Sequence, residues 1–230
     1  MVRRLCILCF LVALWPGFAL AQSAAVMEAL NRYKVLYDQS RYAEAEPFAR
    51  KALELSEKEL GPHHPFTGIS LYSLAGVYWP QGRYAEAEPL YKRSLAILKR
   101  SLGSDHYSVA RSLNGLANLY KAQGRYADAE PLYKRSRMIF EKAHGLDHPS
   151  VAGSLNNLAN LYAEQGRYAE AEPLYKRSLA IAEKALGPDH PRLALLILEN
   201  YAALLRETGR GAEAKKMEAR AKAIRAKHAE

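Results

Sequence analysis

The sequence predicts an all-α protein, an array of about five helical hairpins with ten helices in all. Three observations support this prediction. The string QGRYAEAEPLYKRSLAI occurs at residues 81–97 and again, unchanged, at 165–181, while residues 123–139 differ from it at three positions. A turn that contains histidine recurs with the same period. Each unit also carries two runs of apolar residues spaced three and four apart, which is the pattern of amphipathic helices.

The first residues of the chain have the features of a cleavable signal peptide, which we assign to residues 1–21. Arg3 and Arg4 precede an apolar run over residues 5–15, and an Ala-Leu-Ala triplet ends at Ala21, where we expect cleavage. The alternative is a membrane anchor. Eleven helical residues, however, rise only about 16 Å, half of a hydrocarbon core of about 30 Å. We therefore expect export, to the periplasm or the medium, as a soluble protein.

Both cysteines, Cys6 and Cys9, fall inside the predicted signal peptide, so the mature chain would contain none. That excludes disulfides, thiol catalysis and cysteine metal sites from the mature protein. Removal of the segment also removes Arg3 and Arg4, which lowers the formal net charge from +9 to +7.

The remaining chain, residues 22–230, forms one array with a period of 42 residues. Gln81, Gln123 and Gln165 begin the repeated string, and a looser copy begins at Gln39. The last copy, from Glu207, comes one residue late and has lost its tyrosines. Five units follow, at roughly 24–63, 64–105, 106–147, 148–189 and 190–228. Divergent end units are expected in a stacked array, because each has one face in water.

Each unit divides into two helices, which we name A and B. In the fourth unit, apolar residues recur at helical spacing over 155–162 and mark helix A, until Gly166 interrupts the pattern. Helix B follows, from about Tyr168 to Leu186, and Gly187 ends it. We expect Asp189 to cap the next helix A.

Four prolines lie about five residues inside the B helices: Pro47, Pro89, Pro131 and Pro173. At such a position proline forfeits one backbone hydrogen bond and crowds the preceding turn. We therefore expect a tightened or slightly bent first turn at each proline, and no break in the helix.

These patterns resemble the tetratricopeptide repeat. Leu155-x2-Leu158-Ala159-x2-Tyr162 in helix A, followed by Ala171-x3-Tyr175 in helix B, match the pattern of that family position by position. The usual period is about 34 residues, and the longer unit here resembles the kinesin-light-chain-like subclass. The resemblance implies a right-handed α-solenoid that binds partner proteins, with its A helices lining a concave groove.

The recurring histidines His64, His106, His148 and His190 raise the question of a metal site. Equivalent residues of stacked helices lie about 10 Å apart, whereas zinc needs ligands about 2 Å from one centre. We therefore interpret the histidines as packing residues of the turn before helix A. No nucleophile–base pair stands apart from the residues repeated in every unit, and no glycine-rich phosphate loop follows a strand. The sequence predicts neither an enzyme nor a bound cofactor.

Much of the basic excess lies on the final helix, in Lys215, Lys216, Arg220, Lys222, Arg225 and Lys227. We interpret this helix as the solvated cap of the array, with contact to an anionic envelope lipid or polymer as the alternative. Nucleic acid is not an expected partner of an exported protein. The sequence leaves the oligomeric state open.

Asparagines are concentrated on the A helices, although Asn is a middling helix former. Two interpretations remain open: hydrogen bonds between neighbouring repeats, or amides that hold the backbone of a bound peptide. We expect Asn157 and Asn200 to bond between repeats, and Asn156 and Asn160 to face the groove.

The groove-facing positions follow from counting two residues before the buried leucine of helix A, and two and five after it. With Arg111 added one turn before Asn114, the predicted peptide-binding residues are Tyr72, Trp79, Arg111, Asn114, Asn118, Lys121, Asn156, Asn160 and Arg206. The amides suit a peptide backbone, and the cations suit an acidic side chain or a C-terminal carboxylate. Trp79 suits an apolar side chain, or else it packs over the end of its own helix before Pro80.

The sequence thus predicts a non-enzymatic interaction scaffold that binds an extended peptide in the concave groove. The alternative is an assembly or regulatory subunit of an envelope enzyme or machine, which docks through the convex face.

Overall fold

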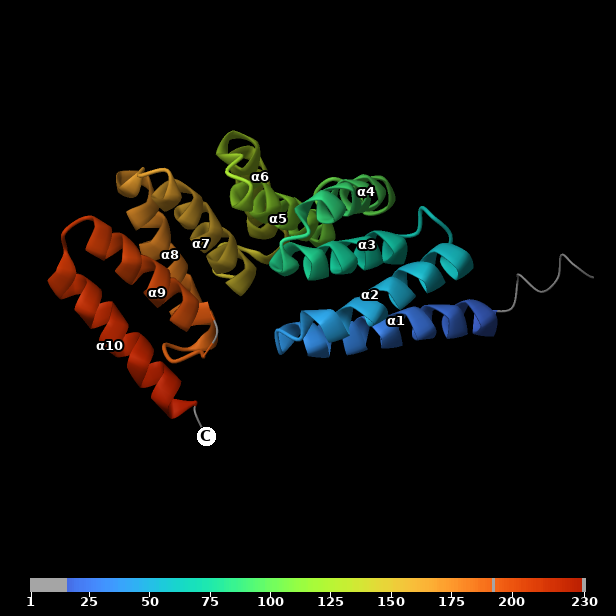
Figure 1. Cartoon of the computed structure of the whole chain (residues 1–230), viewed down its shortest axis with the longest axis horizontal. Coiled ribbons are helices and arrows are strands. Elements are labelled where there is room, and N and C mark those ends of the chain that lie inside the picture. Colours follow the sequence, from blue (N-terminus) through green and yellow to red (C-terminus); the bar gives the residue numbers. More distant parts are fainter. Residues whose placement is uncertain (1–15, 192, 229–230) are drawn as a thin grey trace, which may run out of the picture. The chain divides into compact units, whose positions relative to one another are not determined.

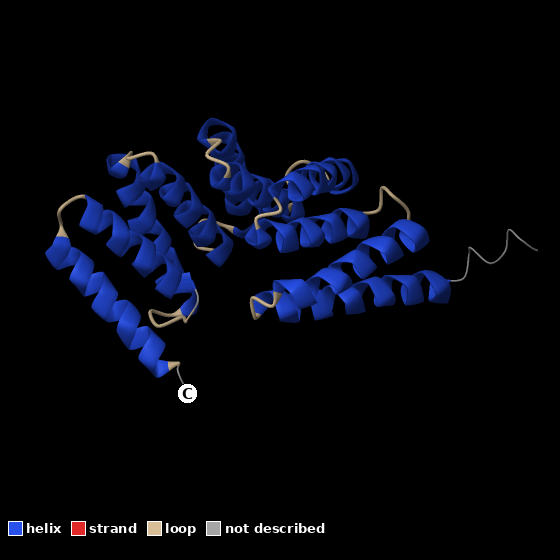
Figure 2. Cartoon of the chain, in the orientation of Figure 1, coloured by secondary structure: helices blue, strands red, loops and turns tan. Residues whose placement is uncertain are grey.

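The computed structural model describes residues 16–191 and 193–228, which form helices joined by short turns (Figure 1). No strand occurs in these two ranges (Figure 2). The predicted signal peptide falls largely on residues 1–15, outside the described residues, and its last residues form the start of α1 (Pro16–Asp38). None of the described helices combines the length and hydropathy that a membrane span needs.

The chain divides into two compact units, residues 1–104 and 105–230, and each is described by itself. In the first unit α1 is followed by α2 (Tyr42–Leu55), the π-helical turn η2 (Ser56–Leu60), α3 (Pro65–Tyr78), the 3-10 turn η3 (Trp79–Gln81) and α4 (Tyr84–Leu102). Helices α1 and α2 pack together, α2 packs on α3, and α3 packs on α4.

The second unit contains α5 (Tyr107–Ala122), α6 (Tyr126–His144), α7 (Pro149–Glu164), α8 (Tyr168–Leu186), α9 (Leu193–Glu207) and α10 (Gly211–Lys227). Each of these helices packs on the next. The odd-numbered helices are the predicted A helices and the even-numbered ones the predicted B helices. The all-α fold of ten helices is therefore confirmed over the described residues, and each of the four prolines lies inside an unbroken helix.

Small residues and one recurring serine let helices A and B approach closely within each hairpin. Ser94, Ser136 and Ser178 are fully buried on the B helices, and each hydroxyl donates to a backbone carbonyl of helix A at 2.7–2.8 Å. At Gly68, one of these carbonyl positions, a Cβ would meet the side chain of Leu98 at 2.8 Å. The serine of the repeated string thus satisfies its own hydroxyl while it fixes the helix pair.

Histidine, and not aspartate, caps the A helices. Nδ1 of His64, His106 and His148 accepts the backbone N–H of the residue two positions later at 3.1–3.2 Å, and His190 accepts from Leu193 at 3.2 Å. The predicted capping role of Asp189 is therefore wrong, because this carboxylate instead bonds Nζ of Lys227. Within residues 16–191 and 193–228, no three His, Asp or Glu side chains are grouped as metal ligands.

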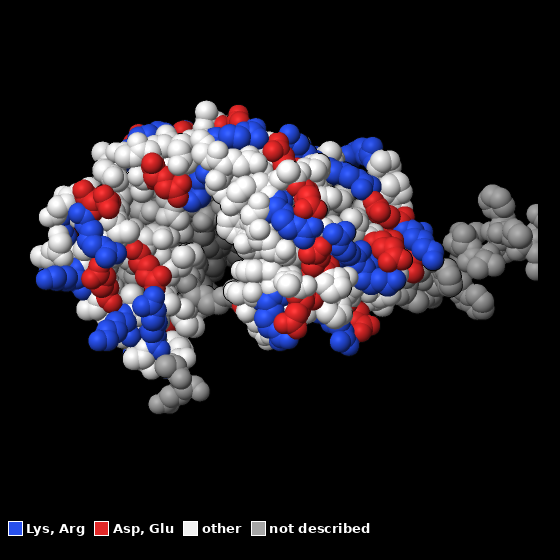
Figure 3. All heavy atoms as spheres, viewed as in Figure 1, with Lys and Arg blue, Asp and Glu red and all other residues white. Residues whose placement is uncertain are grey.

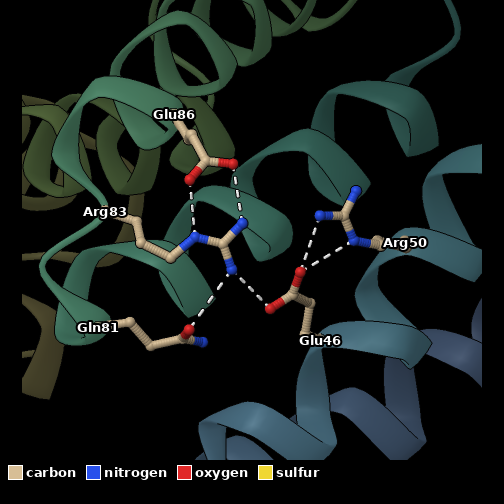
Figure 4. A network of polar contacts seen from close by, with 5 residues as sticks. All are labelled: Glu46, Arg50, Gln81, Arg83 and Glu86. Atoms are coloured by element: carbon tan, nitrogen blue, oxygen red, sulfur yellow. Dashed lines mark hydrogen bonds and ion pairs between the residues drawn. The ribbon is translucent and has the colours of Figure 1, made fainter.

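Within each unit, a repeated arginine joins a hairpin to the one before it. Arg83 donates two hydrogen bonds to Glu86 of its own helix, at 2.7 and 2.8 Å, and Nη1 reaches Glu46 of the preceding repeat at 2.8 Å (Figure 4). The guanidinium carbon lies 3.9 Å from the ring centroid of Tyr78. We call this arrangement, with its equivalents at Arg167 and Arg210, the arginine clasp.

The ion pairs of the clasp recur in the second unit. Arg167 reaches Glu130, and Arg210 reaches Glu172, both at 2.8 Å. Tyr162 and Tyr201 donate their hydroxyls to these two glutamates at 3.0 Å. Hydrogen bonds from Arg210, Lys176 and Tyr201 outweigh partial burial and lower the pKa of Glu172 to about 2. Burial opposes ionisation of Glu130, but bonds from Lys134, Arg167 and Tyr162 still lower its pKa to about 2.

The tyrosines of the B helices are expected to contribute strongly to stability, because Tyr91, Tyr133 and Tyr175 are 3%, 0% and 2% exposed. Replacement of the central one, Tyr133→Ala, should lower the free energy of unfolding by about 3–5 kcal/mol, the usual cost of truncating a large buried aromatic. Urea denaturation measures this. A variant as stable as the wild type would mean that the burial of Tyr133 is not realised in solution.

The clasp makes stability depend on acidic pH. The pKa of Glu172 falls from an ordinary 4.5 to about 2 on folding, so its contribution is present above about pH 4.5 and is lost as the pH falls toward 2. Glu172→Gln should therefore be less stable than the wild type at neutral pH, by at most about 3 kcal/mol before solvent screening is taken into account. The difference between the two should shrink between pH 4.5 and 2. A difference that stays constant over this range would contradict the assignment.

Candidate binding surface on the A helices

Two of the predicted groove asparagines are held by buried tyrosines. The hydroxyl of Tyr133 donates to Oδ1 of Asn118 at 2.5 Å, and the hydroxyl of Tyr175 donates to Oδ1 of Asn160. Burial raises the pKa of both tyrosines, so each hydroxyl keeps its proton and remains a donor. Because the oxygen faces the tyrosine, the Nδ2 group of each asparagine projects from the other branch of the amide with two N–H donors.

Four other asparagines form hydrogen bonds between neighbouring repeats, which is the first of the two interpretations that the sequence left open. Nδ2 of Asn157 donates to Asn114, and Nδ2 of Asn200 donates to Asn156, both at 3.1 Å. This confirms the expected role of Asn157 and Asn200. Asn156 is 1% exposed, which removes it from any surface that a ligand could touch, and the expectation that it faces the groove is wrong.

Two of the three predicted cations already have acidic neighbours. Nζ of Lys121 lies 2.6 Å from Glu164, and Nη1 of Arg206 lies 3.3 Å from Glu218. Arg111 is exposed on the first half of α5. An acidic side chain or a C-terminal carboxylate of a ligand would therefore have to compete with Glu164 for Lys121 and with Glu218 for Arg206.

A hollow of about 420 Å³ lies on the surface of the second unit and brings the A helices α5, α7 and α9 together. Of the predicted residues, Lys121 and Asn160 line it. The other lining residues are Ala163, Glu164, Tyr168, Tyr175, Asn200, Ala203, Leu204 and Glu207. The hollow therefore offers the amide donors of Asn160 and small apolar side chains. Its lining contains two carboxylates, Glu164 and Glu207, and one cation, Lys121.

The two aromatic residues of the predicted strip, Tyr72 and Trp79, belong to the first unit. Tyr72 is half-buried on α3, and its ring forms a T-shaped pair with that of Tyr91 at a centroid distance of 5.7 Å. Trp79 is half-buried in η3, where Pro80 ends the α-helical pattern of α3. Its Nε1 is buried and has no hydrogen-bond partner among the described residues.

Sequence reasoning missed Glu164, Tyr168 and Glu207 as lining residues. Glu164 lies one turn after Asn160, and Glu207 lies at the equivalent position in the next repeat. Each carboxylate lies one residue after the last position that the count reached, Ala163 or Arg206, so a count that took two adjacent residues at that turn would have found both. Tyr168 opens helix B, which the count along helix A does not include.

Comparison with known proteins agrees with the architecture. A family model described as Tetratricopeptide repeat matches residues 25–100, 69–142, 108–184 and 150–227. No curated protein matches the sequence. Among solved structures, the chain is similar to nearly identical TPR-like repeats from Podosopora anserina that are assigned to a kinesin light chain. The identity is 27%, the TM-score is 0.68, and the alignment covers 88% of this chain and 95% of that one.

Two more distant structures share the fold. BtubC (BKLC) from P. vanneervenii is 24% identical, with a TM-score of 0.71 over 92% of this chain and 91% of that one. The pilF protein of Pseudomonas aeruginosa is 19% identical, with a TM-score of 0.61 over 90% and 78%. Overlapping family matches from residue 25 to residue 227, together with the helix pairs described above, show that the chain belongs to the tetratricopeptide-repeat family and carries kinesin-light-chain-like repeats.

Proposed function

We propose that the hollow on α5, α7 and α9 binds an extended segment of a partner protein. Tetratricopeptide-repeat proteins are generally non-enzymatic scaffolds that bind proteins or peptides, and this chain has their fold. The observation that carries the finer proposal is the orientation of Asn160. Its oxygen accepts from Tyr175, so the N–H donors of Nδ2 remain for the hollow that it lines. Two amide donors fixed in this way suit the backbone carbonyl of an extended peptide.

The charges around the hollow favour a neutral or basic segment over an acidic one. Lys121 is paired with Glu164, and Glu207 adds a further carboxylate to the lining. An acidic side chain would have to break the ion pair between Lys121 and Glu164 before it could use the lysine. A peptide backbone can bind without breaking this ion pair, because its carbonyl accepts hydrogen bonds from the amide of Asn160.

The sharpest test replaces the amide donors and keeps the bond to the tyrosine. Asn160→Asp retains an oxygen for the hydroxyl of Tyr175 but offers no N–H to the ligand. A displayed library of unstructured peptides, selected on the wild-type protein, provides the probe. The affinity of the selected peptides for Asn160→Asp should fall about tenfold, because one hydrogen bond is lost and a carboxylate meets a carbonyl oxygen. Calorimetry measures the two affinities.

Asn157→Asp is the matched control, because it makes the same change on the same helix. Nδ2 of Asn157 donates to Asn114 and does not line the hollow, so this variant should lose stability and keep its affinity for the peptides. Replacement of Asn160 or Asn118 by alanine is a poorer test. It would leave a buried tyrosine hydroxyl unpaired, at a cost of roughly 1–3 kcal/mol to stability. Equal affinity of the peptides for the wild type and Asn160→Asp, or failure to select any peptide, would contradict the proposal.

The alternative is a partner that docks on the B helices. Crosslinking distinguishes this from binding in the hollow on the A helices. A photoreactive residue in place of Ala203, on α9 in the hollow, should label the selected peptides. The same residue in place of Ala180, exposed on α8, should not. The opposite pattern would favour a partner that docks on the B helices.

We also infer that the chain is exported and processed. The inference rests on the basic start, the apolar run and the Ala-Leu-Ala triplet within residues 1–21. N-terminal sequencing of the protein recovered from its native cells should give Gln22 as the first residue. A chain that keeps Met1 would overturn the inference.

A further inference from the structure

The outer faces of the first and last helices, α1 and α10, differ in the polarity of their exposed side chains. A terminal repeat needs a polar outer face, and α10 has one, with Lys215, Lys222 and Lys227 exposed. Figure 3 shows basic and acidic side chains together over this helix. On α1, by contrast, Met27 is 40% and Val35 is 58% exposed. These two residues lie four positions on either side of Asn31, which is also exposed, so the three form one stripe along the helix.

Two residues of the stripe on α1, Asn31 and Val35, occupy positions that later repeats use for stacking. Val35 corresponds, at the repeat period, to Val77, Leu161 and Leu204, which are 0%, 0% and 2% exposed. Asn31 corresponds to Asn157 and Asn200, each of which donates to an asparagine of the preceding repeat. At Asn31 and Val35 the outer face of α1 therefore has the composition of an internal face, whereas Met27 corresponds to positions that include the exposed Arg111 and Leu196.

A hollow of about 460 Å³ adjoins the stripe, lined by Asn31, Arg32, Val35, Leu36, Glu44 and Phe48. Its floor is formed by the half-buried side chains of Leu36 and Phe48. An unbranched apolar side chain such as methionine could fill a recess of this kind.

The C-terminal end of another copy does not fit this face. In the clasp, the arginine reaches a glutamate of the preceding repeat, namely Glu46 or its equivalents Glu130 and Glu172. The last repeat has Lys215 at this position. Head-to-tail stacking would therefore place Arg41 against Lys215, and the repulsion between two cations opposes such a fibre.

The α1 stripe is complementary to itself. If two α1 helices cross antiparallel about a two-fold axis at Asn31, Met27 of one copy lies opposite Val35 of the other. Glu28 then lies opposite Lys34, and the two Asn31 amides can bond to each other. Within α1 these two charges already contact Arg32 at 3.5 Å and Asp38 at 2.6 Å, but both pairs lie on the exposed side of the helix and can exchange partners at low cost. Met27 also comes to the edge of the hollow beside Val35. We propose that the protein forms a symmetric dimer through the outer face of α1, with a second copy of the chain as the occupant of this face.

Sedimentation of the full chain over a range of concentrations tests the dimer. The wild type should sediment as a dimer, and Val35→Glu should weaken association about a hundredfold, because it buries two unpaired carboxylates. Its circular dichroism and melting temperature as a dilute monomer should match those of the wild type, since Val35 contacts little within its own chain. The matched control is Met138→Glu, which changes a residue that is 51% exposed on α6 and should leave the dimer intact.

Charge exchange tests the two-fold register. Glu28→Lys alone and Lys34→Glu alone should each weaken the dimer, whereas the double variant should restore it, because opposite charges would again face each other at these two positions. A wild-type chain that is monomeric at every concentration overturns the proposal. So does a Val35→Glu variant that still forms dimers, which would place association elsewhere, for example in residues 1–15. A double variant no better than the single ones would overturn the antiparallel register.

Discussion

The ion pairs that Arg83, Arg167 and Arg210 form at the start of their B helices are the interactions on which the order of the repeats within each unit depends. A single hairpin cannot bury both of its faces, so the fold requires contacts that join neighbours. Arg83, Arg167 and Arg210 supply them, because each binds a glutamate of its own helix and a second glutamate of the preceding repeat. The planar guanidinium also lies against a tyrosine ring at Arg83 and Arg167, which fixes its orientation. One side chain thus sets the turn, the helix start and the distance to the neighbouring repeat.

This requirement explains why the chain repeats one string almost unchanged. In QGRYAEAEPLYKRSLAI, Arg167 and Glu170 form the local bridge, Glu172 accepts the arginine of the next repeat, and Ser178 binds helix A. Tyr175 holds Asn160. Substitution of Arg167 or Glu172 would disturb a neighbouring repeat as well as its own, whereas the contacts of Glu170 and Ser178 hold their own hairpin together. The end repeat is freer to vary, and it has Lys215 where the others keep a glutamate.

The sequence predicts the helices and their buried faces well, because burial follows a local period. Tyr133 and Tyr175 were identified from spacing alone, and both are buried. Contacts between repeats were harder to predict, because they join residues about one period apart. The partners Lys121 and Glu164, and Asn156 and Asn200, are of this kind, and a count along one helix cannot show that a neighbour neutralises a cation or covers an amide. The prediction of the residue that caps helix A was wrong for a different reason. Aspartate and histidine can both accept a backbone N–H, and the backbone places His148, at φ −78° and ψ 143°, at the capping position.

The central claim is that the clasp couples neighbouring repeats, and a double-mutant cycle between Arg167 and Glu130 tests it most directly. The free energies of unfolding of Arg167→Met, Glu130→Gln and the double variant are compared with that of the wild type by urea denaturation. If the clasp couples the third and fourth repeats, the two changes should be non-additive, with a coupling energy of about 1–2 kcal/mol. Additive effects, with coupling below about 0.3 kcal/mol, would contradict the account and would leave apolar burial and the other contacts between repeats, such as the bond between Asn157 and Asn114, to join them.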